Sequence, residues 1–211
     1  MIDLSNSKPF ANGGNRACYQ HPENINICLK ITHPDLPNKL KAKAPWYKKY
    51  RSLDSFDDNK REELAYNQKA ISKNESIVWD HLVRWHGFEE TSMGLASATE
   101  MVLNDGMIAE TLESYLFTYG KDEKITAAIN DFENWLKKTL ILTKNIIPHN
   151  IVVKKTEGKL QLKIIDGLGC SSFLPLPKIS NFFAKRYVSR RVELMHSRID
   201  WDLSGRRGSW K

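Results

Sequence analysis

Thr143-Lys-Asn-Ile-Ile-Pro-His-Asn150-Ile-Val-Val153 and Leu162-Lys-Ile-Ile-Asp166-Gly-Leu-Gly169 are the two stretches that decide the fold of this chain. The first places an asparagine directly before a short apolar strand, and the second ends a strand on an aspartate in a glycine-flanked turn. Asn150 and Asp166 are 16 residues apart, and a polar turn at 154–159 joins the two expected strands. One amide oxygen and one carboxylate suit a hard divalent ion that takes its other ligands from phosphate and water.

Protein kinases hold magnesium with this arrangement, an Asn from the catalytic loop and an Asp from the turn after the next strand. The upstream sequence agrees, because Gly13 and Gly14 separate two expected strands and Lys30 lies near the end of the next run. Glycine lets backbone amides approach phosphate oxygens, and a strand lysine reaches the α- and β-phosphates. The Gly-Gly-Asn turn is also typical of an ordinary hairpin, so both interpretations stay open. No P-loop motif occurs, which excludes that phosphate cradle.

A helix is expected over residues 57–71, with acidic residues at its start and with Leu64 and Ile71 seven positions apart on one face. A kinase needs a glutamate from this helix to ion-pair with the strand lysine. Glu62 and Glu63 both compete for that role, and at least one of them is expected to be a solvated surface charge.

A hinge between two lobes is expected near residues 101–106, where a short apolar strand runs into a glycine turn. A kinase-like chain would bind adenine there through the backbone around Glu100 and Val102. Asp122 then opens a long helix with one apolar stripe, which predicts core packing. The stripe consists of Ile125, Ala128, Ile129, Phe132, Trp135, Leu136 and Leu140. The Asn150 loop follows directly, in the order that the kinase plan requires.

Five short motifs occur in a fixed order along the chain: Cys18-Tyr-Gln-His-Pro22, Cys28-Leu-Lys-Ile31, Glu62-Glu-Leu64, Pro148-His-Asn-Ile151 and Asp166-Gly-Leu-Gly169. This order resembles the bacterial YrbL family, described as PhoP regulatory network proteins, in the wider protein-kinase-like superfamily. The resemblance spans roughly residues 9–175 and implies ATP and Mg²⁺ as cofactors. It also implies that Glu63, the glutamate before Leu64, pairs with Lys30. Asn150 and Asp166 would hold the metal.

One position departs from the kinase pattern. Active kinases carry an aspartate five residues before the metal-binding asparagine, where it accepts the proton of the substrate hydroxyl. That position is Asn145 here, and an amide cannot take up a proton near neutral pH. Phosphoryl transfer depends mostly on positioning and electrostatics, so the loss is expected to slow transfer and need not abolish it. Asn145 and Asp166 are the candidate catalytic residues, and His149 is expected to be an ordinary loop histidine.

The part of the chain after Asp166 is short for a kinase. Its 45 residues have room for one loop and two helices, and no Ala-Pro-Glu motif follows. The peptide-docking platform of eukaryotic-type kinases is therefore expected to be missing. A small molecule, a lipid-linked sugar or a protein bound in another way would then be the acceptor, and the sequence does not choose among them.

Two stretches combine basic and aromatic residues. Residues 178–211 carry nine Lys and Arg against three acids, and residues 39–51 carry six Lys and Arg and no acid. Such a composition is typical of segments that bind a nucleic acid or an anionic membrane surface. The alternative is amphipathic helices whose rings pack inward, which is favoured for Phe182, Phe183 and Trp201. Residues 204–211 are expected to form a flexible tail.

The composition fits a soluble globular protein of 211 residues with a net charge of +7 and three cysteines. An odd, scattered set of cysteines suits a reducing compartment. No secretory signal and no apolar run of membrane-spanning length is visible, so a cytoplasmic location is expected.

The sequence therefore predicts an α+β fold, a compact two-lobed protein-kinase-like fold with a truncated C-terminal lobe. Residues 1–102 would form a lobe of antiparallel sheet plus one helix, and residues 103–211 a mostly helical lobe with the catalytic-loop hairpin and a basic tail. Three functions stay open: an ATP-dependent phosphotransferase (or AMP transferase) with an unknown acceptor, a pseudokinase that regulates a protein partner, and a basic nucleic-acid or membrane-surface binder. The expected nucleotide-binding residues are Gly13, Gly14, Lys30, Glu63, Glu100 and Val102.

Overall fold

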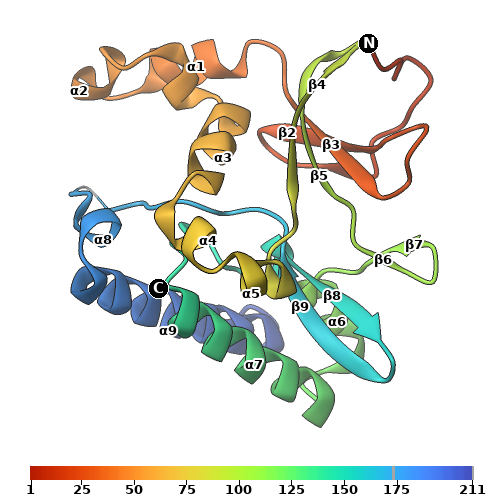
Figure 1. Cartoon of the computed structure of the whole chain (residues 1–211), viewed down its shortest axis with the longest axis vertical. Coiled ribbons are helices and arrows are strands. Elements are labelled where there is room, and N and C mark those ends of the chain that lie inside the picture. The colour runs from red at the N-terminus through yellow and green to blue at the C-terminus, as the bar shows by residue number, and fades with distance from the viewer. Residues whose placement is uncertain (173, 211) are drawn as a thin grey trace. The chain divides into compact units, whose positions relative to one another are not determined.

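The computed structural model describes residues 1–172 and 174–210 of the chain (Figure 1). The chain forms two units, of which unit 1 comprises Met1–Tyr66 and Arg84–Met101. Unit 2 comprises Asn67–Val83 and Val102–Lys211. The return to unit 2 after Met101 lies one residue from the predicted boundary, but residues 67–83, which the prediction placed in the first lobe, belong to unit 2.

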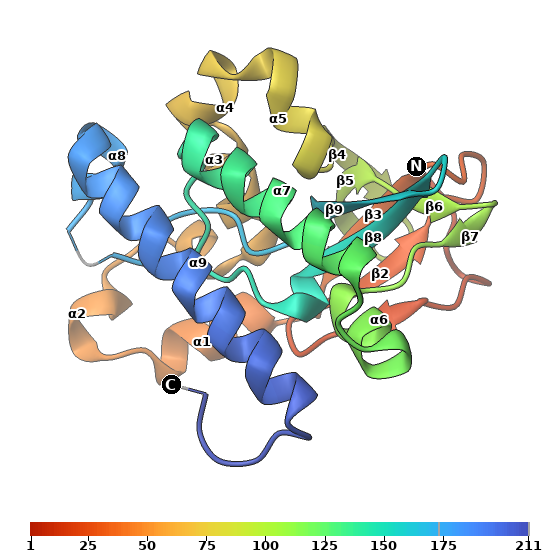
Figure 2. The ribbon, with the colours of Figure 1, turned by 90° about the horizontal axis from the view of Figure 1, so that it is seen from below.

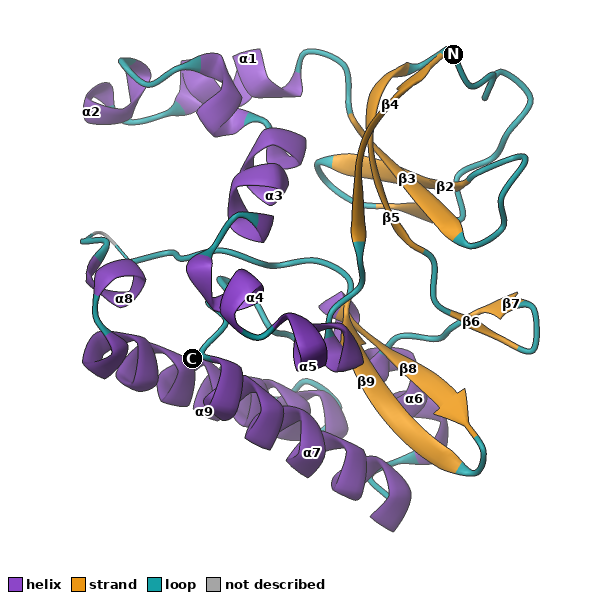
Figure 3. Cartoon of the chain, in the orientation of Figure 1, coloured by secondary structure: helices purple, strands orange, loops and turns teal. Residues whose placement is uncertain are grey.

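Unit 1 is built on a five-stranded antiparallel sheet with the strand order β1-β2-β3-β5-β4 (Figure 3). Side chains alternate between the two faces of each strand. One face is apolar and forms the core of the unit, with Ala17, Tyr19, Leu29, Ile31, Ala96 and Ala98 packed around Leu4. The other face carries Arg16, Lys30 and Ser97, all of them buried. The strands are β1 (Ala11–Asn12), β2 (Arg16–Gln20), β3 (Ile27–Thr32), β4 (Trp85–Thr91) and β5 (Gly94–Glu100).

The segment between β3 and β4 supplies the helices of unit 1. These are α1 (Leu36–Lys43), α2 (Trp46–Lys49), the 3-10 helix η1 (Leu53–Phe56) and α3 (Asp58–Tyr66). The expected helix over 57–71 is thus too long, because α3 ends at Tyr66 and Ile71 lies in a separate helix of unit 2. Leu64 is exposed, and the buried face of α3 consists of Asn59, Glu62, Ala65 and Tyr66.

Unit 2 is mostly helical, with two small hairpins. Its long central helix α7 (Glu123–Thr139) packs against β9 and against the C-terminal helix α9 (Figure 2). Asp122 caps α7 by accepting a hydrogen bond from Ile125 N. The predicted stripe is confirmed as core for every member from Ile125 to Leu136, and Leu140 ends the helix half-buried. The other elements are α4 (Lys69–Lys73), α5 (Glu75–His81), β6 (Leu103–Asn104), β7 (Met107–Ile108), α6 (Leu112–Tyr119), the 3-10 helix η2 (Pro148–Asn150), β8 (Ile151–Thr156), β9 (Lys159–Ile164), α8 (Leu176–Ile179) and α9 (Asn181–Leu203).

The C-terminal region differs from its prediction in two ways. Phe182 and Phe183 are exposed, so the expected inward packing is wrong for both, because the buried stripe of α9 runs through Ala184, Val188, Val192 and Met195 instead. Residues 204–211 were expected to form a flexible tail, but Arg206 in this stretch forms ion pairs with Glu113 and Asp202. In the part of the chain that the structure describes, no helix is both long and apolar enough to cross a membrane.

Candidate functional site

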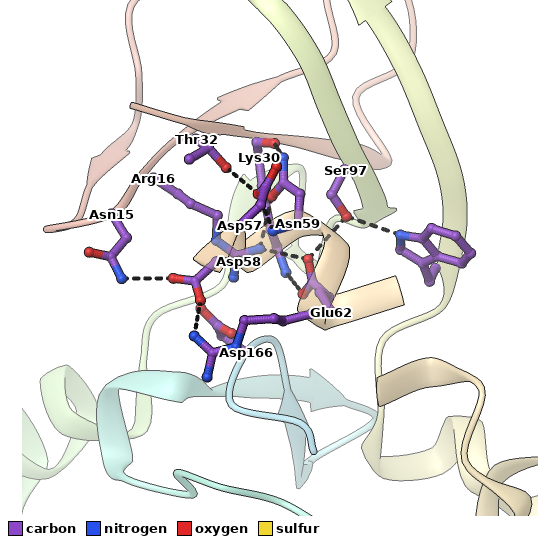
Figure 4. A network of polar contacts seen from close by, with 12 residues as sticks. Asn15, Arg16, Lys30, Thr32, Asp57, Asp58, Asn59, Glu62, Ser97 and Asp166 are labelled. Atoms are coloured by element: carbon purple, nitrogen blue, oxygen red, sulfur yellow. Dashed lines mark hydrogen bonds and ion pairs between the residues drawn. The ribbon is translucent and has the colours of Figure 1, made fainter. Parts of the chain in front are cut away.

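The polar face of the sheet in unit 1 is organised around Lys30 and Glu62. Lys30 lies in the middle of β3, with Cys18 of β2 opposite on one side and Ser97 of β5 on the other. Its ammonium Nζ lies 2.7 Å from Oε1 of Glu62 on α3 (Figure 4). Both side chains are buried, with 5% and 6% of their surface exposed. A lysine and a glutamate therefore form a buried ion pair within unit 1.

Two further donors hold the second oxygen of Glu62. Arg16 Nη1 lies 2.7 Å from Oε2, and the Ser97 hydroxyl donates to the same oxygen at 3.0 Å. Ser97 in turn accepts from the indole N–H of Trp85 at 3.0 Å. Asn59, one helical turn before Glu62, accepts from Arg16 at 3.2 Å and donates to the backbone carbonyl of Lys30 at 3.0 Å. The carboxylate thus has a fixed orientation, and α3 is bonded to the sheet through polar groups alone at this point.

The structure corrects the predicted glutamate. Glu62, and not Glu63, pairs with Lys30. Glu63 forms a looser pair with Lys60 at 3.4 Å, and about a third of each side chain is exposed. The reason is helical phase: Asn59 and Glu62 are three residues apart, so they share the face of α3 that meets the sheet. The resemblance implied Glu63, the glutamate before Leu64, but Leu64 is exposed and does not lie on the buried face of α3.

Arg16 and Lys30 both contact the carboxylate of Glu62. Cys28 lies two residues from Lys30 on the same face of β3, and its hydrogen bond to Cys18 and its burial raise the pKa of the Cys28 thiol well above its usual value. The thiol beside this ion pair therefore stays neutral.

Gly13 and Gly14 form the exposed turn between β1 and β2. Gly13 N donates to the carbonyl of Arg16 at 2.9 Å, and the Gly13 carbonyl bonds to the ring of His33 at 2.9 Å. Neither glycine has a positive φ, and a Cβ built on Gly14 would meet no atom within 4 Å. The fold of unit 1 therefore does not require glycine at either position.

The two expected adenine-binding residues lie on opposite sides of the boundary between the units. Glu100 ends β5 in unit 1, and its Oε2 accepts from Arg84 N at 3.1 Å. Val102 belongs to unit 2, where it is buried with Val83, Ala109 and Val152. The Val102 carbonyl already accepts from Ala109 N at 2.9 Å.

The loop with Asn145 and Asn150 in unit 2 is closed onto the turn that carries Asp166. Asn150 Nδ2 donates to the carbonyl of Asn145 at 2.9 Å, and Asn145 N donates to the carbonyl of Gly167 at 3.2 Å. The Asn150 carbonyl accepts from Ile165 N at 3.0 Å. Asp166 Oδ1 accepts from Gly167 N at 2.6 Å. These bonds bring Asn145, Asn150 and Asp166 together, as the sequence predicted.

Gly167 is required for this closure. It has a φ of +88°, and a Cβ on it would lie 2.3 Å from the Asn145 carbonyl oxygen and 3.2 Å from Asn150 Nδ2. An alanine would therefore collide with the backbone of the loop as well as adopt a strained conformation.

Helix α9 supports the start of the same loop. The hydroxyl of Tyr187 donates to the carbonyl of Thr143 at 2.9 Å and accepts from Ser171 N at 3.1 Å. Arg191 packs over the Tyr187 ring, 4.9 Å from its centroid, and also bonds to the Ser171 hydroxyl. One phenol thus joins the segments before and after the Asp166 turn to the C-terminal helix.

The donor set in unit 2 fits a magnesium ion of the kind that nucleotides carry. Asn150 uses its Nδ2 to bond to the loop backbone, so Oδ1 is the atom of this amide that would bind a cation. Among residues 1–172 and 174–210, no group of three or more acidic, His and Cys side chains could hold a metal by itself. An amide and a carboxylate alone suit Mg²⁺ that arrives with phosphate and water ligands.

Four residues at these sites were not predicted from the sequence: Arg16, Asn59, Ser97 and Tyr187. Strand alternation puts Arg16 on the same face as Cys18, the residue opposite Lys30, which is a usable signal. Asn59 could have been found from its three-residue spacing to Glu62. Ser97 and Tyr187 come from distant parts of the chain, and only the three-dimensional structure brings them to these positions.

Comparison with known families gives one match over nearly the whole chain. The model of the family described as PhoP regulatory network protein YrbL matches residues 2–200. The uncharacterized protein YrbL of Escherichia coli (strain K12) is 26% identical over 195 residues, which are 90% of this chain and 84% of that protein. The protein of the same name from Shigella flexneri gives the same values.

Solved structures of similar fold are protein kinase domains. The Mycobacterium tuberculosis PknI kinase domain has a TM-score of 0.52 and 13% identity, covering 92% of this chain and 73% of that chain. The structure of Rad53 1–466 in complex with AMP-PNP has a TM-score of 0.52 and 17% identity, covering 94% of this chain and 47% of that chain. At such identities the likeness shows the fold alone, and the predicted kinase-like α+β fold is confirmed.

Proposed function

Because this chain belongs to the family described as PhoP regulatory network protein YrbL and has a kinase-like fold, we propose that it binds ATP together with Mg²⁺. In this proposal Lys30 binds the α- and β-phosphates, Glu62 holds Lys30, and Asn150 and Asp166 bind the metal ion. The glycine pair at 13–14 approaches the phosphates through its backbone. Mg²⁺ would neutralise phosphate charge, and the residues of the chain would position the nucleotide.

The observation that carries the proposal is the buried Lys30–Glu62 ion pair. Taking two charges out of water costs several kcal/mol per ion, and a packed apolar pair of similar volume is often as stable or more stable. Stability alone is therefore a weak reason for this pair. An ammonium that Glu62 already holds in a fixed position is instead suited to an anionic ligand such as a triphosphate.

Three other observations support the same ligand. Gly13 and Gly14 are glycines in a turn that does not need them, which suits a backbone that a phosphate approaches closely. Rad53, which shares the fold, was solved in complex with AMP-PNP, an ATP analogue. Asn150 and Asp166 provide the two oxygen ligands that a nucleotide-bound magnesium takes from a kinase.

The first experiment measures ATP binding by calorimetry and by thermal stability, with and without Mg²⁺. At a nucleotide concentration a hundredfold above Kd, the expected stabilisation is about 2.7 kcal/mol. Lys30→Met and Asp166→Ala should each weaken binding at least about tenfold, since each removes a charged contact worth about 1.5–3 kcal/mol. Lys60→Met and Asp200→Ala are matched controls, because Lys60 pairs with Glu63 and Asp200 is exposed on α9. No stabilisation by ATP at any concentration would refute the proposal.

Whether bound ATP reacts depends on Asn145. A phosphotransferase with an amide at this position would orient the acceptor hydroxyl without taking its proton, and would be slow. A pseudokinase, the second candidate, would bind ATP and transfer nothing. The observation that favours it is Asn145 itself, in the position of the catalytic aspartate.

Asn145→Asp separates these two functions. The loop bonds of Asn145 use its backbone N–H and carbonyl, so the aspartate fits without loss of either bond. General-base assistance contributes about 10²–10⁴-fold, so a slow phosphotransferase should gain ATP turnover or autophosphorylation of that order. A protein that binds ATP but shows no turnover in either form is a pseudokinase.

A further inference from the structure

The segment 36–53 of unit 1, which we call the basic arm, carries exposed basic and exposed aromatic side chains next to one another. It contains α1, α2 and the start of η1, and neither α1 nor α2 buries a single residue. Trp46, Tyr47 and Tyr50 are 76%, 51% and 89% exposed. A soluble protein rarely leaves three neighbouring aromatic rings in water unless they contact a partner.

The charge of the basic arm is strongly one-sided. Its six cationic residues have no acidic residue among them, while the net charge of the whole chain is +7. None of the six forms an ion pair with a described acidic residue. They are Lys39, Lys41, Lys43, Lys48, Lys49 and Arg51.

The C-terminal basic region, the predicted contact for an anionic surface, uses its charges differently. Arg198 and Arg206 form ion pairs with Glu113 and Asp202. Arg191 is engaged with Tyr187 and Ser171. Arg191, Arg198 and Arg206 are therefore held by other side chains of unit 2, whereas no cation of the basic arm forms an ion pair with a described acidic residue. The basic arm is thus the better candidate for contact with an anionic partner.

We propose that the basic arm docks on an anionic lipid bilayer surface, with its lysines over the headgroups and its rings at the headgroup level. Five of the six cations are lysines, and a delocalised anionic surface attracts point charges without the forked geometry of arginine that nucleic acids favour. Trp and Tyr are the aromatic residues enriched at membrane–water interfaces, because each has an apolar body and a polar tip. Leu53, also exposed, adds apolar surface that has no use against nucleotide bases.

The ring geometry disfavours a single-stranded nucleic acid. Stacking of successive bases needs open, similarly oriented ring faces. Trp46 and Tyr47 stand perpendicular, with an interplanar angle of 88° and centroids 6.1 Å apart. Lys48 lies over the ring of Tyr47 at 5.9 Å from its centroid. These two rings therefore present no common stacking surface, whereas insertion between headgroups needs none.

The proposal is tested by co-sedimentation of the full chain with vesicles of phosphatidylcholine alone and of phosphatidylcholine with phosphatidylglycerol. We expect binding to the anionic vesicles only, and weaker binding in 0.5 M salt. Lys39→Gln/Lys43→Gln/Lys49→Gln should lower the partition coefficient on the order of a hundredfold, from about fivefold per lysine. Trp46→Ala/Tyr50→Ala should lower it on the order of tenfold without changing the salt dependence.

The matched control is Lys8→Gln/Lys124→Gln/Lys159→Gln, which removes the same charge from exposed lysines outside the basic arm. It should retain most of the binding. Equal losses in both triple variants, or equal binding to neutral and anionic vesicles, would overturn the proposal. Tighter binding to a twenty-residue oligothymidylate than to the anionic vesicles would do the same and would assign the basic arm to nucleic acid. Lys30→Met should leave vesicle binding unchanged, so this result does not depend on ATP binding.

Discussion

Lys30 Nζ lies 2.7 Å from Glu62 Oε1, and both side chains are buried in unit 1. The neighbouring Glu63 pairs with Lys60, and about a third of each of these two side chains is exposed. A single position along α3 therefore separates a carboxylate inside the polar cluster from one at the surface, and the two residues form a natural pair for mutation.

Glu62→Gln should destabilise unit 1 by about 3–5 kcal/mol, because it removes a buried carboxylate that both Arg16 and Lys30 contact. Glu63→Gln should cost less than about 1 kcal/mol, since it removes a partly exposed pair that salt screens. Urea unfolding of both variants measures the difference. Equal losses of unfolding free energy would show that Glu62 is not the paired residue in solution.

The choice between Glu62 and Glu63 shows which features of the site could be predicted from the sequence alone. The order of the motifs was enough to predict a lysine, a helical glutamate, an asparagine in a loop and an aspartate in the turn after the next strand, because each of these depends on local sequence. Which face of α3 is buried could not be predicted from local sequence in the same way. Its buried face is chosen by Asn59 and Glu62 bonding to the sheet, whereas apolar periodicity pointed to exposed Leu64.

Gly167→Ala should disrupt the packing of the Asn150 loop against the turn that carries Asp166. The added Cβ would meet the Asn145 carbonyl oxygen at 2.3 Å, at a φ of +88°. Gly158→Ala is a matched control, since Gly158 has a φ of +80° but no atom within 4 Å of its Cβ position. The control should lose about 1–2 kcal/mol from backbone strain alone.

The Gly167 variant should lose at least about 1–3 kcal/mol more than the Gly158 variant, because overpacking adds to the strain. Thermal unfolding of both proteins gives this comparison. The magnesium dependence of ATP binding should also disappear only in the Gly167 variant. Indistinguishable stabilities would mean that the loop moves aside at little cost.

Stability should fall with acidification below about pH 6.5, the ordinary pKa of histidine. Burial lowers the pKa of His81 in the folded chain, and its Nδ1 bonds to the Leu162 carbonyl at 2.7 Å. A lowered folded-state pKa means that the unfolded chain binds the proton more tightly. The contribution of neutral His81 is therefore complete above pH 6.5 and is lost as pH falls through the lowered value.

A second loss should begin below about pH 4.5. Hydrogen bonds from Lys137 and His196 lower the pKa of Glu133 in the folded state, so its contribution is present above that pH and lost as the carboxylate is protonated. Unfolding free energy measured between pH 5 and 8 isolates the His81 effect. His81→Asn should flatten the slope there, whereas His86→Asn, at an exposed position, should leave the slope unchanged.

The C-terminal half gives a second example of what could and could not be predicted from the sequence. The burial of α7 could be predicted because six apolar positions from Ile125 to Leu136 repeat at helical spacing on this one helix. Helix α9 has a weaker pattern, and its buried stripe is displaced from Phe182 and Phe183, whose rings lie exposed before the first buried residue, Ala184. The support that Tyr187 gives to the Thr143 carbonyl joins residues 44 positions apart and has no local signature.

Tyr187→Phe tests whether this support matters for the Asn150–Asp166 loop. The substitution keeps the ring but removes the hydroxyl that donates to Thr143 O and accepts from Ser171 N. Buried Thr143 would lose its partner from α9, which should cost about 1–3 kcal/mol. Tyr119→Phe is the matched control at an exposed ring and should change the unfolding free energy by less than about 0.5 kcal/mol.

If the hydroxyl positions the loop, Tyr187→Phe should also weaken Mg²⁺-dependent ATP binding more than ATP binding in EDTA. A purely global destabilisation would affect both equally at temperatures where the variant stays folded. Calorimetric titration at 15 °C with and without Mg²⁺ measures the ratio of the two affinities. A ratio equal to that of the unmodified chain would leave Tyr187 as a stabilising contact of α9 with no influence on the metal-binding residues.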